Sequence, residues 1–405
     1  MKKEKRLVAI ILGLAMLFAL SACNQGNPST EDSADADGGA AASTTGDTIK
    51  IGYYGPFTGA NSTTGIATFE GISIAIDEWN KNGGVLGKEI ELVYYDDAGV
   101  TESAIKAVTR LIDSDNVVGI IGSQMSANIV ATGDMIEASQ IPEVSCGTSA
   151  TWLDQGYTYL FRTVPENTTG TVALADAIEA VGTTKLAVLC SKDEASQGSC
   201  QQTLDALAAS GKVEVTIQTE CHEDDTDWTG QLSSMVATNP DGVYLSILGE
   251  YAGQVIKQLR SFGYTGYIFG HEVMSLNEIR EIAGDGANGI IFFSTYCRPD
   301  TYEECTSEYE KHYWDLHMEM YDGAIPTNDN SYKGYDEANI LLTAISDAGS
   351  TDGQAIRDAL ANISGLECLA GTANYANFDD GNGFEAMNIY IIDEGKIVLL
   401  DSYLK

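Results

Sequence analysis

Short β-prone runs alternate with amphipathic segments along this chain, and the alternation restricts its fold more than any other feature. The first run, Ile49 to Gly55, ends in Gly-Pro, and large apolar residues then recur at spacings of three and four from Ile66 to Trp79. This spacing predicts a strand followed by a helix. Gly83-Gly84 ends the helix, because glycine adopts positive φ readily. Repetition of this unit predicts parallel sheets covered by helices on both faces.

The alternation runs in two successive series, one before and one after Pro165. The predicted strands after the first are at 90–95, 117–121, 185–190, 213–219, 242–248, 267–269 and 289–294, with a C-terminal hairpin at 387–392 and 396–400. About 355 residues follow Thr48, which exceeds the roughly 250 to 300 that a single core accommodates. We therefore expect an α/β protein with two Rossmann-like lobes.

The first 22 residues have the pattern of an export signal, with basic residues between Lys2 and Arg6 before an apolar run from Leu7 to Leu20. A membrane-spanning helix is the alternative, but a span needs roughly 20 apolar residues and this run is shorter. The run closes with Leu-Ser-Ala-Cys23, which resembles the lipobox of bacterial lipoproteins. The resemblance implies lipid attachment at Cys23 and an extracytoplasmic protein anchored to the cell membrane; ordinary cleavage beside an incidental cysteine is the alternative.

Residues 23–48 contain small, hydroxylic and acidic residues and no large apolar side chain up to Thr48. Such a composition cannot offset the entropy of ordering, so we expect a flexible acidic linker. The whole chain has a formal net charge of −37. That charge repels phosphate groups, which argues against a nucleic-acid partner, but it does not identify a ligand.

Seven cysteines remain once Cys23 is set aside, and an odd number leaves at least one thiol free or paired between molecules. Exported proteins form disulfides, and Cys297 with Cys305, across a polar turn, is the first candidate pair. Metal ligation is the other reading of cysteine. No Cys-x-x-Cys pair exists and the chain has 4 histidines, so we expect no metal and no cofactor.

Three loops follow predicted strands of the first series, at residues 54–59, 122–126 and 145–151. Ligands of open α/β sheets bind beyond the carboxyl ends of the strands, where such loops lie. Each loop offers small residues, hydroxyls and backbone N–H groups at a helix start, which suits a carboxylate. Ordinary helix capping explains any one of them. Their convergence favours a binding site.

The chain resembles the leucine/isoleucine/valine-binding family of ABC-transporter receptors, which have the type I periplasmic binding fold. The stretches that carry this resemblance are Gly55-Pro-Phe-Thr-Gly59, Asn82-Gly-Gly-Val-Leu-Gly87, Tyr95-Asp-Asp97, Ile121-Gly-Ser123, Phe161-Arg-Thr163 and Gly270-His-Glu272. It implies two ligand-binding lobes joined by a three-crossover hinge. Lobe one then takes residues 49–165 plus 296–375, and lobe two takes 166–295 plus 376–405.

The resemblance also implies a site. Ser126 and the loop Gly147-Thr148-Ser149 match the positions that hold the carboxylate and ammonium of an amino acid in the lobe-one cleft, and Glu272 matches the lobe-two acid that pairs with the ammonium. The chemistry is consistent, because hydroxyl and N–H donors bind a carboxylate and an acid opposite them favours a cation. A solvated surface acid is the alternative for Glu272.

The wall of the pocket departs from the family. Thr64 stands where branched-chain receptors have a tryptophan, and the lobe-two tyrosine position falls on Leu248, with Glu250 and Tyr251 beside it. The other lobe-two aromatic position falls near Ala195. We therefore expect an amino acid or a small amide as ligand, without choosing leucine, isoleucine or valine. ABC permease subunits are the expected partners of a monomer.

Two other functions compete with uptake. An enzyme is disfavoured, because no nucleophile, base and orienting group can be assembled. His271 is isolated and is expected to be a hydrogen-bonding or packing residue, and adjacent carboxylates such as Asp96-Asp97 point to opposite faces of an extended segment. A receptor that presents its ligand to a signalling partner uses the same lobes and the same closure. The sequence does not separate that sensor from a transport protein.

Overall fold

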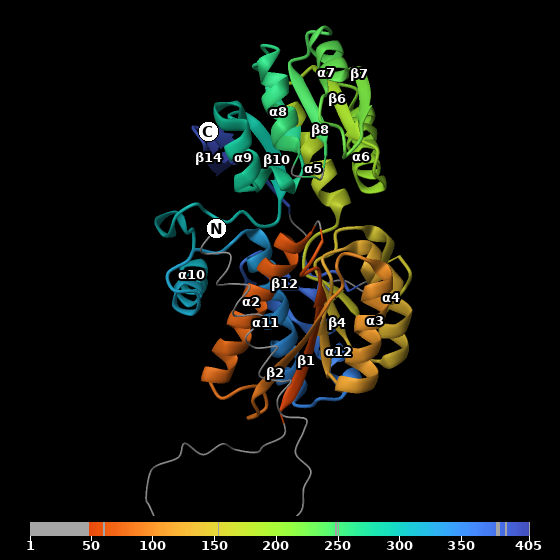
Figure 1. The fold of residues 1–405 in the computed structure, drawn as a ribbon, viewed down its shortest axis with the longest axis vertical. Helices are drawn as coiled ribbons and strands as arrows, with labels where there is room; N and C mark the ends of the chain where they lie inside the picture. The colour runs from red at the N-terminus through yellow and green to blue at the C-terminus, as the bar shows by residue number, and fades with distance from the viewer. Residues whose placement is uncertain are drawn as a thin grey trace, which may run out of the picture. The chain divides into compact units, whose positions relative to one another are not determined.

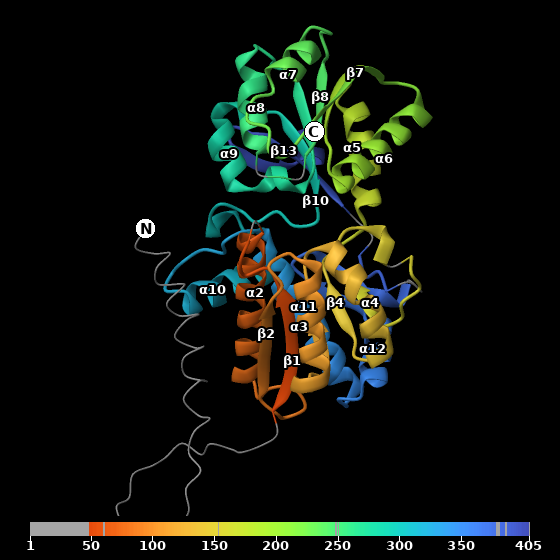
Figure 2. The same cartoon turned by 45° about the vertical axis from the view of Figure 1, so that its right-hand side comes forward.

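A computed structural model describes residues 48–404 apart from 60, 153, 248, 250, 378–380 and 385–386 (Figures 1 and 2). The predictions for the export signal, Cys23 and the linker up to residue 47 lie outside the described residues, as do those for Leu248 and Glu250. In the part of the chain that is described, no helix has the length and apolar character needed to cross a membrane.

The first sheet has five parallel strands in the order β2-β1-β3-β4-β5. Its strands are β1 (Ile49–Gly55), β2 (Ile90–Asp96), β3 (Gly119–Ile121), β4 (Glu143–Ser145) and β5 (Leu160–Arg162). The core on one face is shared with α2 (Ser62–Lys81), α10 (Glu308–Met320), α11 (Asp329–Ala348) and α12 (Gly353–Asn362). The core on the other face is shared with α3 (Thr101–Arg110) and α4 (Ser126–Ser139). We call this sheet with its helices lobe one.

Helix α11 packs tightly on α2 although more than 200 residues separate them (Figure 1). Two glycines make the approach possible. A Cβ on Gly71 would lie 1.9 Å from the carbonyl oxygen of Ser331, and one on Gly334 would lie 2.0 Å from that of Thr68. The close packing fixes the first turns of α11, which contribute side chains to the candidate site described below.

The second sheet has seven strands in the order β14-β13-β10-β9-β8-β6-β7. They are β6 (Lys185–Ser191), β7 (Glu214–Cys221), β8 (Gly242–Ser246), β9 (Tyr267–Gly270), β10 (Ile290–Ser294), β13 (Asn388–Asp393) and β14 (Lys396–Leu399). One core includes α5 (Asn167–Ala180) and α6 (Glu194–Ser210); the other includes α7 (Thr229–Val236), α8 (Ala252–Ser261) and α9 (Asn277–Ala283). We call this sheet with its helices lobe two.

The chain passes between the two sheets three times, after β5, after β10 and before β13. The predicted α/β fold with parallel sheets is confirmed. The second sheet also has an antiparallel edge, where β13 pairs with β10 and with β14. A small hairpin, β11 (Ser364–Cys368) with β12 (Gly371–Asn374), and the short helix α13 (Leu400–Tyr403) were not predicted.

The predicted Cys297–Cys305 disulfide is wrong, because the two free thiols belong to different lobes. Cys297 packs against a core of lobe two, whereas Cys305 is buried in the core of lobe one. The residues between them form the second crossover. Closeness in sequence therefore does not bring these two sulfurs together.

Candidate functional site

The two lobe-one loops that carry the predicted ligand residues meet at Ser126. This serine is the first residue of α4, and its Oγ accepts a hydrogen bond from the backbone N of Ser149 at 3.3 Å. Gly147 also lies close to Ser126, because a Cβ added to this glycine would be 3.0 Å from the Ser126 Oγ. The carbonyl of Thr148 accepts a bond from the backbone N of Asn167, at the start of α5, at 2.9 Å. The loop after β4 therefore contacts both α4 and the first crossover.

Arg162 holds this loop from beneath. Its side chain is fully buried at the end of β5 and donates from Nη2 to the carbonyl oxygen of Ser149. The guanidinium lies 4.7 Å from the centre of the Trp152 ring, and its Nη1 is 3.3 Å from a carboxylate oxygen of Glu166. Trp152 in turn donates to the carbonyl of Gly147 at 3.3 Å. The sequence motif contained Arg162, but no role followed from it.

Asp96 and Asp97 point to opposite sides of the chain, as predicted, and each holds a different loop. The exposed carboxylate of Asp96 accepts bonds from the backbone N and the hydroxyl of Thr58, at 3.3 and 2.6 Å. The buried carboxylate of Asp97 accepts from Ser123 at 2.7 Å and from Asn128 at 2.9 Å. These contacts give the acids a positioning role in the loops at the carboxyl edge of the sheet.

Two buried acids lie beneath the lobe-one loops. Glu143 accepts hydrogen bonds from Ser145 at 2.7 Å and Tyr54 at 3.1 Å, and burial raises its pKa to about 7. Glu337, on α11, accepts from Thr163 at 3.5 Å. Burial raises the pKa of Glu337 well above its usual range. Both acids are therefore buried beneath the Ser126–Ser149 loops and are held by hydroxyl groups.

Glu272 begins a short 3-10 helix, Glu272–Ser275, and faces α11 of lobe one. Its Oε2 lies 3.5 Å from Nζ of Lys333, whose side chain is 9% exposed. Burial disfavours the charge on Lys333, but Glu272 and other nearby acids outweigh that effect and raise its pKa. The acid predicted to receive a ligand ammonium therefore already faces an ammonium of the protein. Sequence reasoning missed Lys333, because a lysine on a helix is usually a solvated surface residue.

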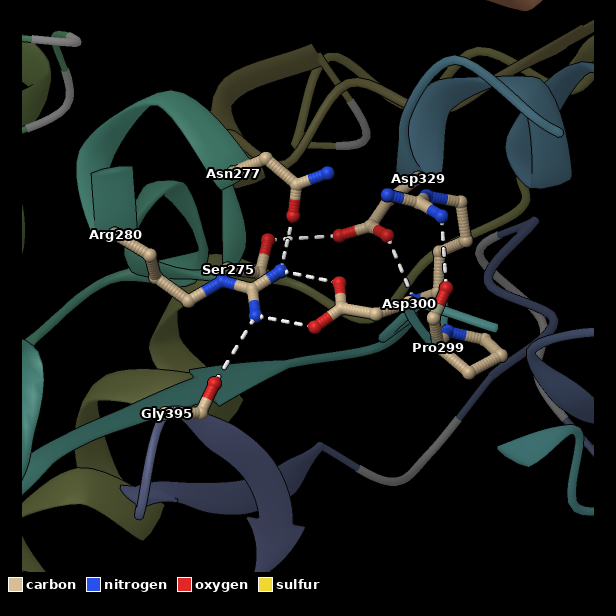
Figure 3. Close-up of polar contacts among 8 residues, drawn as sticks. Ser275, Asn277, Arg280, Pro299, Asp300, Asp329 and Gly395 are labelled. Carbon is tan, nitrogen blue, oxygen red and sulfur yellow. Dashed lines mark hydrogen bonds and ion pairs between the residues drawn. The ribbon is translucent and has the colours of Figure 1, made fainter. Parts of the chain in front are cut away.

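A second contact joins the same two segments one helical turn away (Figure 3). The Ser275 hydroxyl donates to Oδ2 of Asp329 at 2.7 Å, while Oδ1 of Asp329 accepts from the backbone N of Arg298 at 2.8 Å. Beside it, Arg280 donates to both carboxylate oxygens of Asp300 at 2.7 and 2.8 Å. The second crossover and the 3-10 helix of lobe two are therefore fastened to the start of α11.

The remaining predicted residues lie on separate elements. Thr64 is part of α2, where its carbonyl accepts from the Thr68 hydroxyl at 3.1 Å. Tyr251 precedes α8 and stacks on Trp228, with ring centres 6.1 Å apart. His271 is buried and lies 3.0 Å from the Tyr244 hydroxyl, in agreement with a hydrogen-bonding role. Among the described residues, no group of three or more histidine, cysteine or acidic side chains is placed to hold a metal ion.

Comparison with known proteins gives one family. A sequence profile described as "periplasmic binding protein" matches residues 48–396. A relative named "amino acid binding protein" from Pseudomonas aeruginosa is 27% identical over 238 residues, which cover 58% of this chain and 63% of the relative. A "Leu/Ile/Val-binding protein homolog 3" from Brucella melitensis is 24% identical, and the match covers 87% of this chain and 94% of that protein.

A solved structure supports the same relationship. The chain is similar to a leucine-binding protein, LivK, from Thermotoga maritima, with a TM-score of 0.74 and 26% identity. The match covers 87% of this chain and 97% of that structure. The predicted resemblance to leucine/isoleucine/valine-binding proteins is thereby confirmed.

Proposed function

Because this chain belongs to the periplasmic binding protein family, we propose that it captures a small polar ligand outside the cytoplasm and delivers it to an ABC permease. The family implies an extracytoplasmic location and a ligand-binding role. An amino acid is the ligand we favour, with a small amide as the alternative. We propose closure of lobe two on lobe one around the ligand, and no catalytic step.

The lobe-one loops offer donors suited to a carboxylate. The N-terminus of α4 begins at Ser126, and the first N–H groups of a helix have no partner within the helix. The Ser149 hydroxyl, 2.8 Å from that of Thr151, belongs to the adjacent loop. Arg162 and Trp152 fix this loop through hydrogen bonds within the protein. Its donors therefore need little rearrangement when a ligand binds.

The observation that carries the proposal is the contact between Glu272 and Lys333 across the two lobes. Glu272 sits where a carboxylate from lobe two can pair with a primary ammonium, and Lys333 supplies one in this structure. An amino acid brings the same group, so we propose that its ammonium displaces Lys333 from Glu272. The displaced lysine then lies beside the ligand carboxylate that it can neutralise.

A thermal-shift screen of the purified protein against the common amino acids and small amides tests this proposal. A ligand present at a hundred times its dissociation constant stabilises the folded state by about 2.7 kcal/mol. Ser149→Ala and Glu272→Gln, each alone, should reduce the shift, and the double variant should abolish it. Unchanged ligand affinity in the double variant would remove the site assignment.

Matched variants separate the site from the surface. Glu278→Gln changes an exposed acid shortly after Glu272, and Ser114→Ala changes an exposed lobe-one serine. Both should leave the thermal shift as it is in the unsubstituted protein, since surface substitutions rarely change stability by more than about 0.5 kcal/mol.

We also propose that the protein is held at the membrane by a lipid on Cys23. Incorporation of a labelled fatty acid into the unsubstituted protein and into Cys23→Ala tests this directly. Label should be lost from the variant; equal labelling of the two proteins would exclude the anchor while leaving the ligand proposal untouched.

A further inference from the structure

Two cysteines of lobe two lie together at the carboxyl edge of the second sheet. Cys190 is the residue before the last of β6, and Cys200 lies in the second turn of α6. They are 3% and 1% exposed and belong to the same apolar core. Neither was expected to pair from the sequence, because nothing in their spacing distinguishes them from the other five cysteines.

The contacts of Cys190 place its sulfur on the face of α6 that carries Cys200. Its thiol lies 3.6 Å from the carbonyl oxygen of Ser196, which precedes Cys200 by one helical turn. The same carbonyl accepts a bond from Ser246 at 2.7 Å, so this part of α6 is tied to β8 as well. The two thiols are also close enough for each to shift the pKa of the other.

The interaction between the two thiols prepares the pair for thiol chemistry. It raises the pKa of Cys190 and lowers that of Cys200, because a thiol that donates to a neighbouring sulfur stabilises the thiolate there. The thiolate is the species that attacks a disulfide.

We propose that Cys190 and Cys200, which are free thiols in this structure, form a disulfide in the exported protein. When local opening of α6 uncovers the pair, the Cys200 thiolate attacks a small disulfide such as oxidised glutathione, which releases one glutathione thiolate and leaves a mixed disulfide. The Cys190 thiol then loses its proton and displaces the second glutathione. The protein loses two electrons and two protons, and the oxidant is reduced to two thiols. Extracytoplasmic compartments permit this reaction, whereas the cytosol keeps thiols reduced.

The bond would join the end of β6 to α6 and restrain the loop between them. Cys221 is the competing partner, because it is buried on the neighbouring strand, where it pairs in register with Ser191. The other cysteines lie in lobe one or at the second crossover. The proposal thus commits to one pair among the seven thiols of the described residues.

Peptide mapping of the unsubstituted protein tests the pair without any substitution. The native protein is treated with oxidised glutathione or diamide, unfolded in iodoacetamide to block free thiols, and digested with trypsin without reduction. Lys192 lies between the two cysteines, so trypsin releases peptides 186–192 and 193–212. We expect these two peptides to be found joined, with a mass two hydrogens below their sum, and two fewer titratable thiols.

Three variants and the reduced protein complete the test. Cys221→Ala should retain the joined peptides, whereas Cys190→Ala and Cys200→Ala should lose them. The oxidised protein should melt at a higher temperature than the protein reduced with dithiothreitol. Carboxamidomethyl groups on both peptides after diamide treatment would overturn the proposal, as would a link from 186–192 to 213–257, the peptide that contains Cys221. No ligand is used, so the outcome is independent of the proposed transport function.

Discussion

The carboxyl edges of the two sheets are stabilised by the same kind of cluster with opposite acid–base character. In lobe one the buried Glu143 is hydrogen-bonded by Tyr54 and Ser145. In lobe two the buried His271 lies 3.0 Å from the Tyr244 hydroxyl and 3.1 Å from that of Ser246. Burial raises the pKa of Glu143 to about 7 and lowers that of His271 to about 4.

The comparison shows that burial shifts the pKa of a carboxylic acid and that of an imidazole in opposite directions. Burial disfavours the charged form of either group, so each edge is most stable when its central group is neutral. An acid is neutral at low pH and a histidine at high pH. These two groups therefore change the stability of the protein with pH in opposite directions, and their effects partly cancel.

Glu143→Gln should remove the pH dependence that Glu143 contributes to the free energy of unfolding and leave that of His271. The folded-state pKa of Glu143 is raised above the unfolded value of 4.5, so its stabilising effect is present below pH 4.5 and is lost as pH rises through about 7. That loss amounts to about 3 kcal/mol, at 1.36 kcal/mol per pKa unit. The variant should gain that much stability relative to the unsubstituted protein between pH 4.5 and 8, measured by urea unfolding.

The control for this comparison is Glu89→Gln, an exposed glutamate of the same lobe. The difference in free energy of unfolding between this variant and the unsubstituted protein should stay constant over the same pH range. A constant difference for Glu143→Gln as well would show that Glu143 is ionised and stabilised at every pH tested.

His271→Gln should have the opposite effect and a similar size. Its folded-state pKa is lowered from 6.5, so its stabilising effect is present above pH 6.5 and is lost as pH falls through about 4. The variant should therefore lose less stability than the unsubstituted protein on acidification, by about 3 kcal/mol. The exposed histidine in His222→Gln is the control, and identical acid unfolding of both variants would contradict the prediction.

Gly147→Ala should weaken lobe one where the two site loops meet. The new Cβ would lie 2.5 Å from Cδ1 of Ile129 and 3.0 Å from the Ser126 Oγ, so the loop must move. Overpacking of this kind costs about 1 to 3 kcal/mol, and we expect ligand affinity to fall about tenfold or more. In Gly198→Ala, on α6 of lobe two, the added carbon meets no atom within 4 Å. Isothermal titration should give Gly198→Ala the same ligand affinity as the unsubstituted protein.

Ser275→Ala should have the smallest effect, because it removes one hydrogen bond between the lobes, to Asp329. A single bond contributes about 1 kcal/mol, which is roughly a fivefold loss of affinity if closure depends on it. Ser261→Ala, on the exposed end of α8, serves as the comparison. Equal affinities for the two variants would show that the Ser275 contact does not contribute to the closed state.

Much of the fold could be predicted because its long elements have regular apolar spacing. The predicted run Ile49 to Gly55 coincides with β1, and the helix expected from the apolar spacing between Ile66 and Trp79 is α2. β5 was missed because it has only three residues, too few to show a period. The β11–β12 hairpin was missed for a different reason. Only Cys368 and Ala373 are buried in it, so its strands show no alternation of apolar and polar residues.

The candidate site was less predictable, because its missing parts depend on tertiary contacts. Lys333 is buried although it is a helical lysine, and its partner Glu272 comes from the other lobe. Arg162 ends a strand too short to be recognised, and its role follows from the Trp152 ring beside it. The roles of Thr64 and Tyr251 remain predictions, as do those of Ser126, Thr148, Ser149 and Glu272.

The third passage between the sheets has a consequence for synthesis. Strand β13 lies between β10 and β14 in the second sheet, yet it is among the last residues that a ribosome adds. Strand β10 is synthesised nearly a hundred residues earlier and cannot pair with β13 until β13 has been made. Pairings so distant in sequence also form slowly. Nascent chains should therefore remain incomplete, and open to chaperones, until translation is almost finished.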